Sequence, residues 1–165
     1  MSESERDAIE MMERCHRRLE ERARELVDLA AAKERDEEAL ADVLDFFSKV
    51  TRRHFADEEQ SIFPRLPDDR AELAAALAAE HREHEALLAR LEAAARGEGD
   101  LLATAKLWSE ALMSHAARED DELLPLLRAM GDGARTAITA EMKARRGRGR
   151  GRRGGGGGRG GGGRD

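Results

Sequence analysis

The spacing of the apolar residues is the feature that most constrains the fold of this chain. In four segments the apolar side chains recur every three or four residues, which places them on one face of an α-helix. These segments span residues 9–30, 40–61, 73–95 and 101–122. Pro64 and Pro67 interrupt the chain after the second segment, and Gly97 and Gly99 interrupt it after the third. Each segment is therefore predicted to form a separate amphipathic helix.

The connections between these segments limit how the helices can be arranged. The second, third and fourth segments are joined by short linkers, so helices that are neighbours in the chain should run antiparallel. Asp68 and Asp69 are predicted to cap the third helix, and Asp100 the fourth. A short fifth helix is predicted after Gly133. The expected fold class is all-α, an up-down-up-down antiparallel four-helix bundle with a short C-terminal fifth helix and a disordered Gly/Arg tail.

The C-terminal segment differs sharply in composition from the rest of the chain. Residues 147–165 are almost entirely Gly and Arg, so they have no apolar side chain to bury and are expected to be disordered. The expected domains are therefore a helical bundle at 1–146 and a tail at 147–165. Residues 143–165 contain nine Lys or Arg and one Asp, a charge of +8, which leaves −14 for residues 1–142 out of the total of −6. Because an acidic body repels phosphate, any nucleic-acid binding is expected through the tail alone.

Cysteine content and the length of the apolar runs indicate the compartment. The single cysteine, Cys15, cannot form a disulfide bond within the chain. The chain does not open with a sequence of the signal-peptide type, and its longest apolar run is far too short to cross a bilayer. We therefore expect a soluble, cytoplasmic protein with no membrane partner.

All of the histidines lie on the apolar faces of the predicted helices. They are His16, His54, His81, His84 and His115. Two of them begin similar segments, HFADEEQSIFP from His54 and HAAREDDELLP from His115, and each is followed four residues later by a glutamate, Glu58 or Glu119. At this spacing the histidine and the glutamate lie on one face of a helix, about one turn apart.

A glutamate on an inward face is costly to bury unless a positive charge compensates it. No Lys or Arg shares the inward face near Glu58 or Glu119, so a metal cation is the simplest source of that charge. Imidazole and carboxylate ligands suit a pair of iron ions better than a calcium site or a thiolate zinc site, with manganese and zinc as alternatives. A ferritin-like site would need Glu-x-x-His on two helices, and only Glu13 and His16 have that spacing.

The arrangement of these residues resembles the hemerythrin-like proteins, the HHE cation-binding domain family, over about residues 8–127. The resemblance implies a four-helix bundle that holds two iron ions in a non-haem di-iron centre. The metal ligands that it implies are His16, His54, Glu58, His81, His115 and Glu119.

The third and fourth helices leave alternatives open. Oxygen-carrying members of the family have two histidines four apart on the third helix, whereas His81 and His84 are three apart. His84 is a candidate for a further metal ligand or for a hydrogen-bond partner of one, and Glu85, four residues after His81, is another candidate ligand. Asp120 competes with Glu119 as the bridging carboxylate, and we favour Glu119 because Glu58 holds the same place in the first repeat.

The function implied by the resemblance is binding or reduction of O2 or a related small oxidant, or sensing of iron or oxygen. An incomplete ligand set on the third helix favours oxidation over reversible carriage. Whether the chain is an enzyme is left open. The alternative is a non-catalytic interaction scaffold whose basic Gly/Arg tail binds nucleic acid or acidic partners.

Overall fold

A computed structural model describes residues 6–150 of the chain, and every regular element within them is helical. The all-α class predicted from the apolar spacing is confirmed. The elements in chain order are α1 (Ala8–Ala31), α2 (Glu37–Phe46), η2 (Phe47–Thr51), α3 (Arg52–Asp57), η3 (Glu58–Ile62), η4 (Phe63–Arg65), η5 (Asp68–Arg70), α4 (Ala71–Ala95), α5 (Leu101–Glu122), α6 (Leu124–Ala129) and α7 (Asp132–Arg150). Elements η2 and η3 are π-helical, and η4 and η5 are 3-10 turns. No helix within residues 6–150 is both long and apolar enough to cross a lipid bilayer.

Aspartates begin several of these helices. The side chains of Asp7, Asp36 and Asp100 each accept a hydrogen bond of 3.0 Å from the backbone N–H three residues further on. The cap predicted for the fourth helix is therefore present. The cap predicted for the third helix is wrong, because Asp68 and Asp69 form the 3-10 turn η5 and no side chain caps α4.

The predicted second helix is a composite of four elements. α2, η2, α3 and η3 follow one another without a break from Glu37 to Ile62, close to the bounds that the apolar spacing indicates. Each π-helical turn is wider than an α-helical turn and rotates the side chains that follow it, and such turns are frequent at functional sites. The second π-helical turn begins at Glu58, one of the predicted metal ligands.

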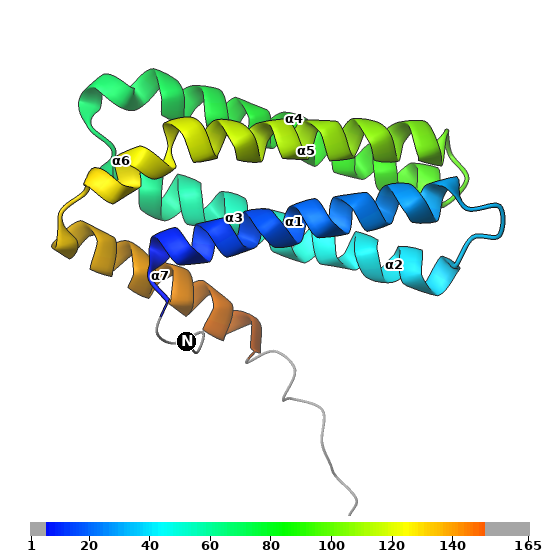
Figure 1. The fold of residues 1–165 in the computed structure, drawn as a ribbon, viewed down its shortest axis with the longest axis horizontal. Helices are drawn as coiled ribbons and strands as arrows, with labels where there is room; N and C mark the ends of the chain where they lie inside the picture. The colour runs from blue at the N-terminus through cyan, green and yellow to red at the C-terminus, as the bar shows by residue number, and fades with distance from the viewer. Residues whose placement is uncertain (1–5, 151–165) are drawn as a thin grey trace, which may run out of the picture.

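The long helices lie side by side, as Figure 1 shows. Helix α5 packs against both α1 and α4, and α1 also packs against α2 and α7. The predicted fifth helix is α7, which buries Ile138 and Met142 and continues to Arg150, past the predicted end of the helical domain at residue 146. The rest of the predicted disordered tail, residues 151–165, lies outside the described residues.

The buried apolar residues form two clusters with a polar layer between them. One cluster surrounds Phe47 and Trp108 and is built by α1, α2, η2, α4 and α5. The other surrounds Met12 and Ile62 and includes residues of α6 and α7. Along α1, α4, α5 and the α2–η3 segment, the histidines and inward glutamates come between residues of the first cluster and residues of the second. The four segments therefore bring their polar residues to the same level of the fold.

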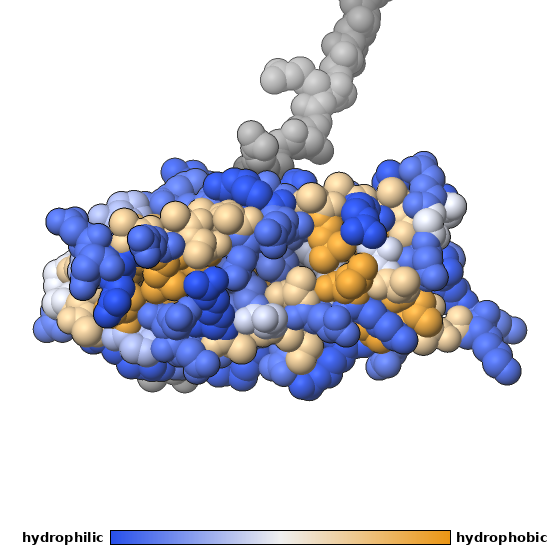
Figure 2. All heavy atoms as spheres, turned by 90° about the horizontal axis from the view of Figure 1, so that it is seen from above, coloured by the Kyte–Doolittle hydropathy of each residue, from blue (hydrophilic) through white to orange (hydrophobic). Residues whose placement is uncertain are grey.

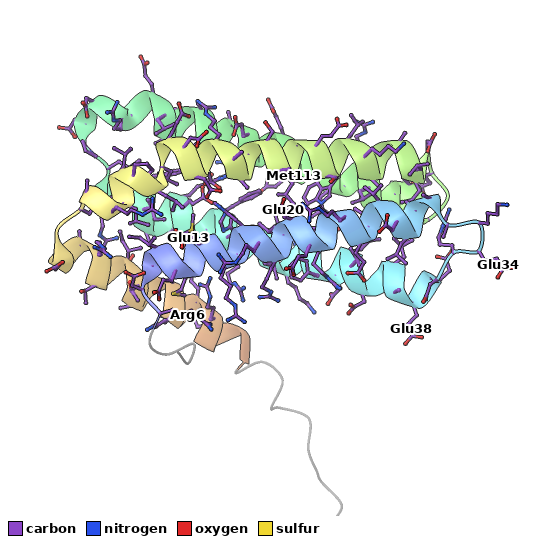
Figure 3. The ribbon with its side chains drawn as sticks, viewed as in Figure 1. Arg6, Glu13, Glu20, Glu34, Glu38 and Met113 are labelled. Atoms are coloured by element: carbon purple, nitrogen blue, oxygen red, sulfur yellow. The ribbon has the colours of Figure 1, made fainter. Side chains whose placement is uncertain are left out.

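The face of the molecule seen in Figure 2 is mainly hydrophilic. In the view from above, Figure 2 shows charged and polar side chains over most of the molecule, with hydrophobic patches between them. Figure 3 shows the labelled Glu34 and Glu38 projecting outward at the end where α1 and α2 are joined. The acidic charge of the body is therefore carried in part by solvated side chains, in contrast to the glutamates of the polar layer.

Candidate metal centre

Four helical segments contribute side chains to the buried polar layer. Each of these side chains is at most 6% exposed. The layer comprises His16 from α1, His54 from α3, Glu58 from η3, His81 and His84 from α4, and His115 and Glu119 from α5. The helical spacing of three or four residues turns each of them away from solvent, because they share their faces with the apolar core residues.

Three of these residues form what we call the His16 group, made of His16, His54 and Glu119. Each offers a ligand atom, and these atoms all lie within 4.8 Å of one another. Glu119 Oε1 is 3.2 Å from His16 Nε2 and 3.3 Å from His54 Nε2. The group therefore converges on one point from α1, α3 and α5.

Four residues form the His81 group, made of Glu58, His81, His115 and Glu119, whose ligand atoms also lie within 4.8 Å of one another. Glu119 Oε1 is 3.2 Å from His115 Nε2, and Glu58 Oε1 is 3.4 Å from His81 Nε2. The other oxygen of Glu58, Oε2, is 2.9 Å from Nε2 of His54 in the His16 group. Glu119 thus belongs to both groups, and Glu58 has one oxygen facing each.

Several polar atoms of these groups are buried without a hydrogen-bond partner. They are both carboxylate oxygens of Glu58, Nε2 of His81, Nε2 of His115 and Oε2 of Glu119. Such atoms are rare in folded proteins, because each one costs about 1–3 kcal/mol when left unsatisfied. Two ligands held about 2.1 Å from one metal ion at right angles lie about 3 Å apart, close to the spacing between these atoms. The donor set therefore fits metal ions placed among the groups.

The outer nitrogens of three ligand histidines contact carboxylates. The Nδ1 contacts are His16 with Asp120 at 2.8 Å, His81 with Glu59 at 3.2 Å and His115 with Glu80 at 2.6 Å. A carboxylate accepts hydrogen bonds, so each of these Nδ1 atoms donates, and the lone pair of the neutral ring then lies on Nε2. The contacts thus prepare the Nε2 atoms that face the groups to bind a metal.

Glu58 and Glu119 have opposite pKa shifts although both are fully buried. Burial and the negative charge of Glu119 raise the pKa of Glu58 well above its ordinary value of 4.5. Burial would raise the pKa of Glu119 too, but the neighbouring Glu58 carboxyl group and the three histidines around Glu119 stabilise its charged form and hold that pKa well below 4.5. Without a metal, the pair therefore favours one neutral and one ionised carboxyl group.

The pKa values of the two histidines that face Glu58, His81 and His54, also shift in opposite directions. Burial lowers the pKa of His81 to about 4, so this ring is neutral near pH 7 and does not compensate Glu58. Burial also opposes a charge on His54, but Cys15 and Glu58 beside it raise the pKa of His54 well above 6.5. A proton on His54 therefore supplies part of the positive charge that a metal would bring.

The three further candidates from the sequence lie outside both groups. His84 is buried beside the His81 group, 5.1 Å from His115 between ring centroids, and its Nδ1 donates to the backbone carbonyl of Glu80 at 2.6 Å. Its Nε2 has no partner. Glu85 is exposed, and Asp120 is half exposed, with its carboxylate on His16.

Sequence reasoning did not assign the contacts that Glu59 and Glu80 make with the ligand histidines. Glu80 is next to His81 in the chain but contacts His115 on α5, and Arg118 donates to its other oxygen at 2.8 Å. Local spacing holds no signal for such a contact, because the two partners are 35 residues apart. Only the packing of α4 against α5 brings them together.

The fold and the buried layer together define a class, that of helical proteins with a histidine and carboxylate cluster of the kind that holds metal ions. The hemerythrin family, described as the hemerythrin HHE cation binding domain, matches residues 7–127, and the chain belongs to this family. The resemblance seen in the sequence is thereby confirmed. No curated protein matches the chain. The family binds metal cations, and the His16 and His81 groups are the candidate ligands here.

Proposed function

We propose that this chain is a non-haem di-iron protein that binds or reduces O2 or a related small oxidant, or senses iron or oxygen. The observation that carries the proposal is the pair of buried groups joined by Glu119, with ligand atoms that lack hydrogen-bond partners. We place the groups inside the up-down-up-down four-helix bundle predicted from the sequence, and Cys15, the single cysteine, favours a cytoplasmic setting.

Iron is favoured by the type of ligand atom. Both groups offer imidazole nitrogen and carboxylate oxygen, and neither includes Cys15, the only source of a thiolate. Calcium sites use oxygen ligands, and structural zinc sites are commonly rich in thiolate, whereas mixed nitrogen and oxygen sites suit iron. Manganese or zinc would be recognised by the same metal analysis that tests for iron.

In this proposal His16 and His54 would hold one ion, Glu58, His81 and His115 would hold the other, and Glu119 would contribute to both. A bound iron pair would supply electrons and open coordination positions for the oxidant. Asp120, Glu59 and Glu80 keep the histidine rings oriented, as the Nδ1 contacts indicate.

The surroundings of the site exclude water and leave one acceptor free. Phe55 stacks on His81, with 3.9 Å between the ring centroids, and the two apolar clusters close the layer on either side. The Nδ1 of His84 donates to a carbonyl, so in the neutral ring Nε2 keeps its lone pair. We assign this Nε2 as a further ligand or as the acceptor of a hydrogen bond from a protonated group at the site.

Metal analysis of protein purified without chelator tests the proposal. The wild type should contain about two iron ions per chain, one for each group, and its visible spectrum should change when the reduced form meets air. His54→Ala and His115→Ala should each lose most of the iron. Ser114→Ala, an exposed neighbour of His115 on the same helix, should keep it. Retention of two irons by both histidine variants would contradict the ligand assignment.

A further inference from the structure

Helix α7 begins at Asp132, beyond residues 7–127 that match the family. It packs against α1, α3 and η3, the last two being the segments that carry His54 and Glu58 (Figure 1). Ile138 and Met142 attach it to the apolar cluster around Ile62. Apolar packing therefore accounts for the attachment of α7, and its polar contacts need a separate explanation.

Two of these polar contacts meet at Asp57, the residue before Glu58. Arg145 Nη1 donates to Asp57 Oδ1 at 2.9 Å, and Arg146 Nη1 donates to Asp57 Oδ2 at 3.1 Å. Asp57 is completely buried, and Arg145 also donates to Ser61 Oγ, one turn further along the same helix. The two arginines thus bind both carboxylate oxygens of Asp57. We call the cluster of Asp57, Arg145 and Arg146 the α7 clasp.

A buried ion pair is a weak source of stability, because removing the charges from water offsets most of their attraction. Apolar residues of similar size at these positions would stabilise the attachment of α7 at least as well. What the clasp adds is geometry, because two guanidinium groups fix the direction of Asp57 far more narrowly than apolar packing does.

The direction of Asp57 bears directly on Glu58. Adjacent residues of a helix point about 100° apart, so a fixed Asp57 also fixes the direction in which Glu58 leaves the helix. The constraint acts where it is needed, because the chain changes from α-helix to the wider π-helix between these two residues. Glu58 contacts the ligand histidines His54, at 2.9 Å, and His81, at 3.4 Å, so support from outside the site comes through its neighbour Asp57.

We propose that the α7 clasp positions Glu58 for metal binding, so that Asp57, Arg145 and Arg146 are positioning residues of the His81 group. The inference rests on the proposed function, since it concerns how tightly that group holds its ion. It assigns to α7 a role in metal binding that lies outside the part of the chain matched by the family.

The test uses the full chain and Co²⁺, whose visible absorption reports the geometry of its ligands. Metal-free Asp57→Asn should bind one Co²⁺ like the wild type and a second about tenfold more weakly, with a changed absorption spectrum. Glu141→Gln is the matched control. It weakens the contacts of α7 with Arg65 and Ser61, which lie at 2.6 Å and 2.9 Å from Glu141, and leaves Asp57 untouched. This control should lose stability but keep both affinities and the spectrum.

Equal Co²⁺ affinities and spectra for Asp57→Asn and Glu141→Gln would overturn the proposal. The α7 clasp would then only help to attach α7 and would not position Glu58. If Asp57→Asn does not fold, Arg146→Ala leaves Asp57 bound to Arg145 and should show the same change at smaller size, while an unchanged second affinity would overturn the proposal. Failure of the proposed function would look different, because the wild type would then bind neither Co²⁺ nor Fe²⁺, and both ideas would fall together.

Discussion

The two His-x-x-x-Glu segments, residues 54–64 and 115–125, are alike in sequence but differ in backbone and surroundings. In the first, Glu58 opens a π-helical turn, and the neighbouring Asp57 is buried against α7. In the second, Glu119 lies on the regular helix α5, and the neighbouring Asp120 is half exposed. Similar spacing therefore brings two glutamates to one site through different local structures.

The difference extends to charge. Glu119 lies within 3.3 Å of the Nε2 atoms of three histidines, which hold its pKa down. Glu58 faces His54 and the neutral His81, and the pKa of Glu58 is raised by burial and by Glu119. Glu58 and Glu119 share the same sequence motif, yet their pKa values shift in opposite directions. The ionisation of each buried carboxyl group is therefore decided by the hydrogen-bond donors packed around it and not by its sequence motif.

The largest effect should come from exchanging each glutamate for glutamine in metal-free protein. Glu119→Gln removes the charge that the histidines surround and should lower the free energy of unfolding by about 2 kcal/mol. Glu58→Gln replaces a carboxyl group that burial already favours in its neutral form, so the change should stay within about 0.5 kcal/mol. Urea unfolding at pH 7 measures both. Equal decreases in the free energy of unfolding for the two variants would show that Glu58 and Glu119 do not differ in ionisation.

A smaller effect on metal affinity is expected from Glu80, which contacts Nδ1 of His115 in the second repeat. In the first repeat, Nδ1 of His54 has no hydrogen-bond partner. Glu80→Gln should weaken binding of an ion to the His81 group about tenfold, because the ring loses its charged acceptor. Glu83→Gln, an exposed change on the same helix, is the control. Competition with a chelator of known affinity gives the ratio, and matching affinities for the two variants would show that Glu80 does not orient His115.

The last effect is gradual and concerns the pH dependence of stability. The raised pKa of His54 means that the folded, metal-free chain keeps a proton that the unfolded chain releases above about pH 6.5. This stabilisation is fully present below 6.5 and is lost as the pH rises through the folded value, with a slope of at most about 1.4 kcal/mol per pH unit. Glu58 contributes in the same direction, and Glu119 in the opposite direction below its ordinary value of 4.5.

Urea unfolding of metal-free protein from about pH 6.5 to 9 measures this slope. His54→Gln, which cannot take up the proton, should reduce it. A wild-type stability that stays constant or rises over this range would contradict the assignment of a proton to His54.

Much of the fold was predictable, because helical periodicity is a local property of the chain. The spacing of apolar residues predicted the helical segments and the inward direction of His16, His54, His81 and His115, all of which lie in the buried layer. It did not predict the π-helical turn at Glu58, since the inward residues of this segment are still three or four residues apart in the sequence.

The sequence by itself determined the all-helical class, the burial of the histidines and the family, because each of these follows from residue types and their spacing along the chain. Tertiary structure alone decided which residues share a group, that Glu80 contacts His115, and that Arg145 and Arg146 bind Asp57 across 88 and 89 residues. The opposite ionisation of Glu58 and Glu119 was decided there too. The physical reason is that hydrogen bonds and charges act over a few ångströms in space, so they depend on which helices pack together.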